Sequence, residues 1–231
     1  MTKLWHTDEE LFDLAKKELF TAVVGDVLDK MGIYHQFLPP DIRPIEKEMV
    51  IIGRAMTVLE ADYFVEVMDG TQNAMTAKPF GLLFEAIDDL KPGEVYICTG
   101  ASPRYALWGG LCSIRAVHLK AAGVVVDGYY RDTLEIARLQ FPCFGYGPYA
   151  QDQGARGKVV DFRVPIEIAG IRINPGDLVF GDVDGVLIIP KEAEEEAFTR
   201  ALEKARGEQK VAEAIKNGMG AAEAWNKYGI M

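Results

Sequence analysis

Apolar residues recur at three- and four-residue intervals near both ends of the chain, which predicts helices there. At the amino end, Thr7 and Glu10 form a capping-box pattern that opens a helix, and a second helix is expected over 21–31, stopped by Gly32. At the carboxyl end, 191–217 has the pattern of one long charged helix that ends at Gly218, followed by a short terminal helix that ends at Gly229. Helices are therefore expected to flank the central region.

The central region consists of short apolar runs separated by turn residues, the pattern of β-strands. Strands are expected at 49–58, 95–99, 124–127, 166–173 and 178–189. The last run is interrupted by a turn at Asp182–Gly185. Residues 141–158 are rich in Gly, Pro and aromatic residues and are expected to form a long loop, which is usually functional or mobile.

A helix is expected to begin at Trp108-Gly109-Gly110 and to end at Gly123. Leu111, Ile114, Val117, His118 and Ala121 fall on one stripe of this helix. We therefore expect this stripe to face the core, with His118 as a satisfied core histidine.

Helix–strand alternation followed by β-hairpins predicts an α/β fold with a mixed sheet. At 231 residues, the chain fits a single domain over 1–231. Its core is expected at about 20–190, with flanking helices and a C-terminal helical arm at 191–231.

Composition excludes several classes of protein. The net charge of −10 and the lack of a Lys/Arg cluster argue against a nucleic-acid partner. Apolar runs of about five residues are too short to span a membrane, and three scattered Cys do not form a disulfide framework. A cytoplasmic location is expected.

The segment 124–132, VVVDGYYRD, places Arg131 and Asp132 where a buried strand turns into a helix. Ligands bind at such junctions in α/β proteins, and a cation beside a carboxylate can hold an anionic substrate and a metal ion. Two simpler interpretations stay open. Asp132 is also the expected N-cap of its own helix, in a capping box with Glu135, and Arg131 fits a surface ion pair.

The segment Gly109–Cys112 provides backbone N–H groups at a helix start, which favour anions such as a substrate carboxylate. Close packing of the helix on a strand explains the two glycines equally well. Cys112 fits a small core residue better than a nucleophile, since no His or Asp partner stands at a telling spacing.

Six motifs together resemble one family. They are GRAMT at 53–57, KPGEV at 91–95, WGGL at 108–111, VDGYYRD at 126–132, NPGD at 174–177 and DGVLIIP at 184–190. In this order they are similar to the ribonuclease-E-activity-regulator-A (RraA)-like proteins and the 4-hydroxy-4-methyl-2-oxoglutarate/4-carboxy-4-hydroxy-2-oxoadipate aldolases.

The resemblance implies a β/β/α swivelling-domain-like core, assembled as trimers or hexamers with active sites between subunits. It implies a Mg²⁺- or Mn²⁺-dependent lyase that cleaves a 2-oxo acid through a pyruvate enolate, often with oxaloacetate decarboxylation. On this pattern Asp132 would ligate the metal and Arg131 would bind the substrate and act in catalysis. Gly109, Gly110, Leu111 and Cys112 would hold the pyruvyl carboxylate.

The sequence departs from the aldolase pattern at Gly110, where an acidic residue is expected, separated from Arg-Asp by twenty residues. Asp88, Asp89 or an acidic residue of a neighbouring subunit are the candidate replacements. The bulky pair Tyr129-Tyr130 suggests a different substrate, and Arg104 and Tyr105 are candidate pocket residues.

The sequence therefore predicts a metal-dependent aldolase or decarboxylase acting on a 2-oxo acid. Two alternatives remain. One is a non-catalytic regulator on the same scaffold whose partner is a protein, and the other is a lyase or hydratase for another small acid.

Overall fold

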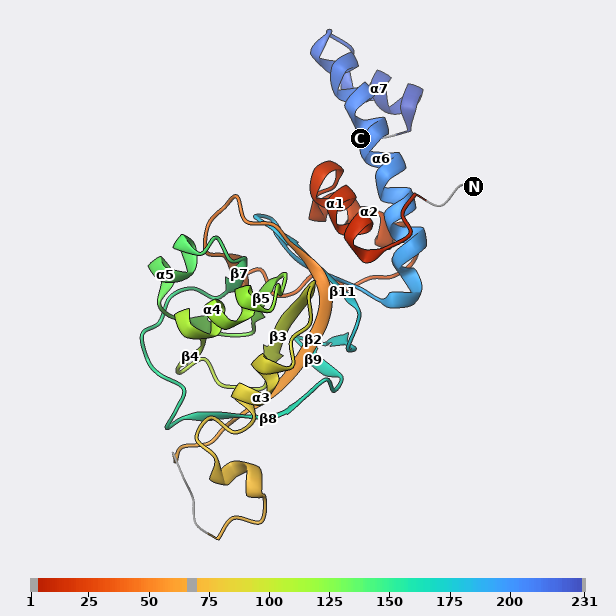
Figure 1. Ribbon diagram of the computed structural model, residues 1–231. Coiled ribbons are helices and arrows are strands. Elements are labelled where there is room, and N and C mark those ends of the chain that lie inside the picture. Colours follow the sequence, from red (N-terminus) through yellow and green to blue (C-terminus); the bar gives the residue numbers. More distant parts are fainter. Residues whose placement is uncertain (1–3, 66–69, 230–231) are drawn as a thin grey trace. The chain divides into compact units, whose positions relative to one another are not determined.

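The computed structural model describes residues 4–65 and 70–229 (Figure 1). The chain divides into two compact units. One unit combines residues 1–34 with 192–231, and the other spans 35–191.

The first unit is helical. It contains α1 (Asp8–Glu18), α2 (Thr21–Lys30), α6 (Glu194–Lys216) and α7 (Ala221–Tyr228), and a short 3₁₀ turn, η2 (Lys191–Ala193), precedes α6. The Thr7 hydroxyl accepts the Glu10 N–H at 3.2 Å, which confirms the predicted cap. Gly32 and Gly229 have φ of +77° and +64° and follow α2 and α7 as expected of helix-ending glycines.

Packing in this unit centres on α6, which contacts the other three helices. The Trp5 and Phe198 rings meet edge to face at 6.4 Å between centroids. Ion pairs join Arg206 to Glu18 at 2.7 Å and Lys204 to Asp26. Within the described residues, no helix is both long and apolar enough to cross a bilayer.

The second unit is built on one eight-stranded sheet. Along the sheet the order is β1 (Arg43–Pro44), β7 (Cys143–Gly145), β5 (Gly123–Val126), β3 (Glu94–Thr99), β2 (Ile51–Asp62), β11 (Leu178–Asp182) and β12 (Gly185–Ile189), and β8 (Gly157–Phe162) also pairs with β2. The neighbours β2–β3, β3–β5 and β5–β7 are parallel, whereas the remaining pairs are antiparallel. The mixed sheet and the long C-terminal helix agree with the predicted α/β class.

Strand β2 extends beyond the predicted 49–58. Its first residues pair with β11, its middle with β3 and its last residues with β8. The pattern hides this extension because Glu60 and Asp62 are charged, yet Glu60 is only 2% exposed. A register shift between Leu59 and Glu60 accompanies this inward charge.

Both faces of the sheet are covered (Figure 1). Along β3, Tyr96 and Cys98 join one hydrophobic cluster, while Val95 and Ile97 join the other. The first cluster includes residues of α3 (Leu83–Asp88), α4 (Gly110–His118) and α5 (Thr133–Arg138). The second includes the hairpin of β9 (Ile166–Ile168) and β10 (Ile171–Ile173). The single run predicted at 166–173 is thus wrong, because Ala169 and Gly170 have positive φ and turn the chain.

Helix α4 buries the face opposite to the one that was predicted. Its buried residues are Gly110, Ser113 and Ala116, whereas Leu111, Ile114 and Val117 are 80%, 44% and 41% exposed and His118 is exposed. Small side chains occupy the face against the core, so the apolar stripe points away from it. The expectation that His118 is a core residue was therefore wrong.

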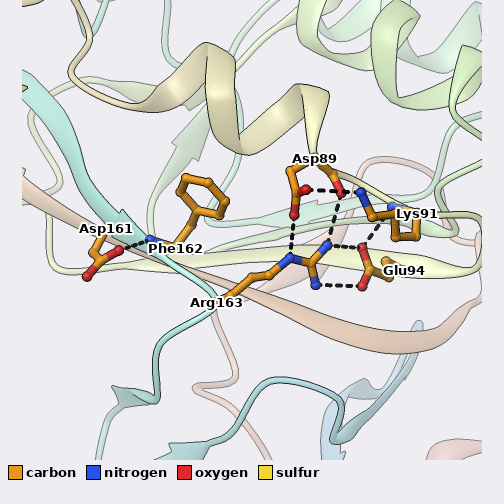
Figure 2. Close-up of polar contacts among 6 residues, drawn as sticks. All are labelled: Asp89, Lys91, Glu94, Asp161, Phe162 and Arg163. Atoms are coloured by element: carbon orange, nitrogen blue, oxygen red, sulfur yellow. Dashed lines mark hydrogen bonds and ion pairs between the residues drawn. The ribbon is translucent and has the colours of Figure 1, made fainter.

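A polar cluster ties the end of β8 to the turn between α3 and β3 (Figure 2). The Arg163 guanidinium donates to both carboxylate oxygens of Glu94, at 2.8 and 2.9 Å, and pairs with Asp89. Lys91 also pairs with Asp89, at 3.0 Å. These cations, Arg163 first, lower the pKa of Asp89, whose carboxylate is committed to this cluster.

The predicted loop 141–158 is only partly irregular. It contains β7, which pairs with β5 and β1 inside the sheet, and β8 begins at Gly157. The irregular remainder, 146–156, runs next to the residues considered below.

Candidate functional site

Two short strands bring the predicted site residues together. β4 (Ala106–Trp108) pairs in parallel with β6 (Tyr129–Tyr130), with Trp108 opposite Tyr130. The Arg131 N–H donates to the Trp108 carbonyl at 2.9 Å. Because both strands end at the same level, the glycines after β4 lie beside the Arg-Asp pair after β6.

Asp132 adopts a left-handed backbone conformation, with φ of +58°, which Asp tolerates better than most residues. Its side chain does not cap α5. Instead, Asp132 Oδ2 accepts the Gly110 N–H at 2.9 Å, at the first residue of α4. Asp132 thus stands at the expected N-cap position of α5, but its side chain does not cap this helix, because the backbone turn directs the carboxylate to the preceding helix.

Arg131 faces two carboxylates. Its Nη1 lies 2.8 Å from Asp152 Oδ1, and its Nε lies 3.8 Å from Asp132 Oδ2. Asp152 Oδ2 accepts the Gly154 N–H at 2.9 Å, which orients the carboxylate within its loop. The Arg131 guanidinium therefore interacts with two carboxylates at once.

The loop before Asp152 is fixed to the two short strands by backbone hydrogen bonds. Tyr130 N–H donates to Gly147, Tyr149 N–H donates to Tyr130, and Ala106 N–H donates to Gln151, at 2.8 to 3.1 Å. The sequence alone did not single out Asp152 or Gln153, because only these long-range pairings place them at the site.

One pocket of about 320 Å³ contains every predicted site residue. These residues are Gly109, Gly110, Leu111, Cys112, Arg131 and Asp132. Asp152 and Gln153 also line it, together with an apolar wall that includes Phe80 and Phe84. Arg131 and Asp132 further line a second hollow of about 290 Å³ beside Tyr149.

The space above Gly110 is filled by a carboxylate from another helix. A Cβ at Gly110 would lie 2.7 Å from the Glu135 carboxyl carbon, closer still to its Oε2, and 3.3 Å from Asp132 Cβ. Glu135 thus stands where a side chain at position 110 would project. Its spacing, one helical turn after Asp132, was the available signal, but it indicated only a capping box.

The replacements proposed from the sequence lie elsewhere. Asp88 accepts from Arg115 Nε at 2.8 Å, and Asp89 belongs to the Arg163 cluster. Neither residue lines the pocket. Glu135 is the acidic residue that the fold brings to Gly110.

The carboxylates at this corner fit a hard divalent cation. Mg²⁺ is commonly held by one or two carboxylates together with several waters, and Mn²⁺ also prefers oxygen ligands. Asp132 and Glu135 supply that pair of oxygen donors. In the described part of the chain, no group of three or more His, Cys, Asp or Glu side chains is arranged to hold a metal.

Other sequence-based candidates have structural roles. Arg104 and Tyr105 both donate to Asp62, at 3.0 and 2.8 Å, and do not line the pocket. Tyr130 is buried in the core, and Tyr129 stacks edge to face on Tyr146 and Tyr149. The expectation that these residues shape the pocket was wrong for this pocket.

Cys112 lines the pocket as a neutral thiol. Burial raises its pKa to about 11, against smaller opposing effects that include the nearby Arg131. A thiol with this pKa is a weak nucleophile at neutral pH. The interpretation of Cys112 as a small wall residue is favoured.

Behind the pocket lies a buried carboxyl group that the sequence pattern did not reveal. Glu60 Oε2 accepts from Gln153 Nε2 at 2.7 Å, and Gln153 lines the pocket. Burial raises the pKa of Glu60 to about 8, although hydrogen bonds from Cys98 and Gln153 oppose this shift. Glu60 is therefore largely a neutral acid at pH 7.

Comparison with known proteins identifies the family of this chain. A protein from Halalkalibacterium halodurans named "Putative 4-hydroxy-4-methyl-2-oxoglutarate aldolase" is 31% identical over 89% of each chain. Protein DlpA of Legionella pneumophila is 29% identical over 90% of this chain, which spans only 32% of that protein.

A crystal structure of an uncharacterized protein from Pseudomonas syringae pv. tomato superposes with a TM-score of 0.82, at 26% identity, covering 99% of this chain and 98% of the other. The family model described as RraA-like, Aldolase/RraA, matches residues 21–188. This match confirms the resemblance that the motifs indicated, and the chain belongs to the RraA-like family.

Proposed function

We propose that the protein is a divalent-metal-dependent carbon–carbon lyase that cleaves a 2-oxo acid by way of a pyruvate enolate. The observation that carries this proposal is the grouping of one guanidinium, Arg131, with the carboxylates of Asp132 and Glu135 around the start of α4. Arg131, Asp132 and Gly110 line one pocket large enough for a small organic acid, and Glu135 reaches it at Gly110.

In this proposal the chain binds the acid through complementary charges. Arg131 pairs with the substrate's 2-oxo acid group as a forked donor. The Leu111 and Cys112 N–H groups belong to the first turn of α4, where backbone donors lack intrahelical acceptors, and they receive the carboxylate. Asp132 holds the Gly110 N–H and so fixes the orientation of that first turn.

The proposed cleavage is a retro-aldol reaction. The bond between C3 and C4 of a 4-hydroxy-2-oxo acid breaks, the C4 hydroxyl loses its proton, and C4 becomes the carbonyl carbon of the released fragment. The bonding electrons pass into the enolate of pyruvate, which then takes up a proton at C3. Arg131 lies where the negative charge of the enolate develops, and a preorganised donor at such a place lowers the barrier.

Asp132 and Glu135 would hold Mg²⁺ or Mn²⁺ in this site. A divalent cation supplies Lewis-acid polarisation of the 2-oxo group, which makes a Schiff-base lysine unnecessary. Glu135 takes over the part that the aldolase pattern gives to an acidic residue at position 110.

The direct test is Mn²⁺-dependent release of pyruvate from oxaloacetate and from 4-hydroxy-2-oxo acids. Arg131→Ala should lower kcat/KM by roughly 10²-fold or more, as does loss of a comparable charge-stabilising donor. Arg138→Ala, which removes an exposed arginine of α5, is the matched control and should retain activity. Full activity in Arg131→Ala would refute the proposal.

Metal binding separates the enzyme from the regulator alternative. We expect Mn²⁺ to raise the melting temperature of the wild-type protein but not that of Asp132→Ala. The absence of both this shift and pyruvate release would favour a non-catalytic regulator that binds another protein.

We also propose that the chain assembles with copies of itself, as a trimer or hexamer, in the cytoplasm and with a swivelling β/β/α core. The support for assembly is the apolar stripe Leu111, Ile114 and Val117 on the outward side of α4, and Leu134 is likewise exposed on α5, which contacts α4. Contiguous apolar patches of this kind commonly mark interfaces. Light scattering should give the mass of three or six chains, and Val117→Lys should reduce it to that of one.

A further inference from the structure

We infer that the preferred ligand is a 2-oxo acid whose far end is apolar, such as an aryl or branched alkyl group, rather than a second carboxylate. The inference rests on the proposed function, because it takes the Arg131 corner as the place of the 2-oxo acid group. It concerns the apolar part of the lining of the same pocket and names the class of substrate.

The charges of the pocket favour a single anionic group on the ligand. Within the described part of the chain, Arg131 is the one Lys, Arg or His residue that lines it. This guanidinium already faces the carboxylates of Asp152 and Asp132. A second ligand carboxylate would lack a cationic partner, and placing an unpaired charge in a partly desolvated pocket is unfavourable.

Much of the remaining lining is apolar and aromatic. Phe80 and Phe84 lie against each other, with ring centroids 5.5 Å apart and planes tilted by 56°. Leu83, Leu107 and Trp108 also line the pocket. Phe84 is 57% exposed although it is a large aromatic side chain, so it has apolar surface available for a ligand.

The aromatic wall is fixed in place by the backbone. The Val159 N–H donates to the Phe80 carbonyl at 3.1 Å, and the Leu82 N–H donates to the Val159 carbonyl at 2.9 Å. Gly81, between them, has φ of +64° and lies too close to the Val159 carbonyl for any Cβ. The segment that carries Phe80 is therefore fixed to β8 by backbone hydrogen bonds of the kind that join two strands.

The size of the pocket allows such a substituent. A cavity of about 150 Å³ accommodates benzene in an engineered protein. The 320 Å³ available here exceeds this volume by enough to admit a three-carbon acid as well. A phenyl group at the far end would contact Phe80 and Phe84 while the acid remains beside Arg131.

The experiment compares 4-phenyl-2-oxobutanoate with 2-oxoglutarate, two stable ligands that share a 2-oxobutanoate chain and differ in the phenyl or carboxylate group on C4. Their affinities for the 231-residue chain are measured by calorimetry with Mn²⁺ present. We expect the phenyl ligand to bind at least ~10-fold more tightly, the order of discrimination that an apolar pocket achieves. Equal or tighter binding of 2-oxoglutarate would overturn the inference.

Variants assign the selectivity to the wall. Phe84→Ala should reduce the selectivity ratio several-fold, and Phe84→Arg should shift it toward 2-oxoglutarate by adding a cation. Phe20→Ala, an exposed phenylalanine of the first unit, is the matched control and should leave the ratio unchanged. An unchanged ratio in both Phe84 variants would also overturn the inference.

This measurement does not depend on turnover. Selective binding without pyruvate release would contradict the lyase proposal alone. Pyruvate release with a preference for dicarboxylates would contradict the inferred substrate class alone.

Discussion

Replacing Glu60 by Gln should remove a large part of the pH dependence of stability. Glu60 is 2% exposed, and burial raises its pKa from 4.5 to about 8. The unfolded chain releases this proton near pH 4.5, whereas the folded protein retains it until about pH 8. Proton binding by Glu60 therefore stabilises the fold fully below pH 4.5, and this stabilisation is lost as pH rises toward 8.

The expected magnitude follows from the size of the pKa shift. One proton retained by the folded state alone changes the free energy of unfolding by about 1.4 kcal/mol per pH unit. Between pH 5 and pH 8 this gives a loss of up to about 4 kcal/mol, an upper estimate for a buried carboxyl group. The amide introduced by Glu60→Gln would keep an acceptor for Gln153 and would not titrate.

The neighbouring groups do not obscure the effect. The ionisable side chains that interact with Glu60 are Tyr96, Cys98, Tyr105 and Cys112, and burial raises the pKa of each. All four remain neutral between pH 5 and pH 8. Glu60 is thus the group of this cluster that changes charge in that range.

The assay is urea unfolding of the wild-type and Glu60→Gln proteins at pH 5, 6, 7 and 8. The difference in unfolding free energy, wild type minus variant, should fall steadily with pH. Glu167→Gln, at an exposed position of β9, should give a flat difference. A flat or rising difference for Glu60→Gln would show that Glu60 is already ionised in the fold.

Two glycine substitutions test other parts of the structure. Gly110→Ala should leave the fold intact, because the Cβ meets the flexible end of Glu135, but the displaced carboxylate should weaken Mn²⁺ binding about 10-fold or more by calorimetry. Unchanged affinity would exclude Glu135 as a ligand. Gly81→Ala should lower the free energy of unfolding, measured in urea, by more than about 2 kcal/mol, because its Cβ would meet the backbone of Val159 at positive φ. Gly170 also has positive φ but lies in open space, so Gly170→Ala should lower the free energy of unfolding by about 1 kcal/mol. Equal losses would contradict the close approach of Gly81 to Val159.

The parts of the fold that sequence predicted are those decided by neighbouring residues. Thr7 and Glu10 cap α1, Gly32 follows α2 and Gly229 follows α7, because capping depends on a few adjacent residues. The hairpin of β11 and β12 likewise follows from a local turn at Asp182–Gly185. Such signals do not require knowledge of the packed structure.

The orientation of α4 shows where this approach fails. Its apolar stripe gave a clear helical period, yet Leu111, Ile114 and Val117 are the outward residues. A period identifies an apolar face but not what covers that face. Small residues against the sheet and large apolar residues outside are the expected pattern when a helix packs closely on one side and presents an interface on the other.

The sequence did not predict the burial of the Glu60 carboxyl group, for a related reason. An acidic residue in a strand predicts a solvent-facing position, yet Glu60 follows Met56 and Val58 on the face of β2 that packs against Tyr96 and Cys98. Asp152 and Gln153 are placed at the site by hydrogen bonds that join distant parts of the chain, Gln151 with Ala106 and Gln153 with Glu60, 93 residues apart in the second case. Their roles depend on distances in space that no spacing along the chain encodes.

Gly110 makes the same point for function. Judged by spacing alone, the glycine at the acidic position of the aldolase pattern counts against the activity. In space, the absence of a side chain at 110 makes room for the Glu135 carboxylate, which approaches from α5 on the same side as Asp132. The present place of Glu135 requires a glycine at 110, since a side chain there would collide with its carboxylate. A Gly at this position, together with Glu three residues after Arg-Asp, therefore brings two carboxylates to one corner in a different way from the aldolase pattern. The glycine alone counts against the proposed metal site, whereas the glycine and Glu135 together support it.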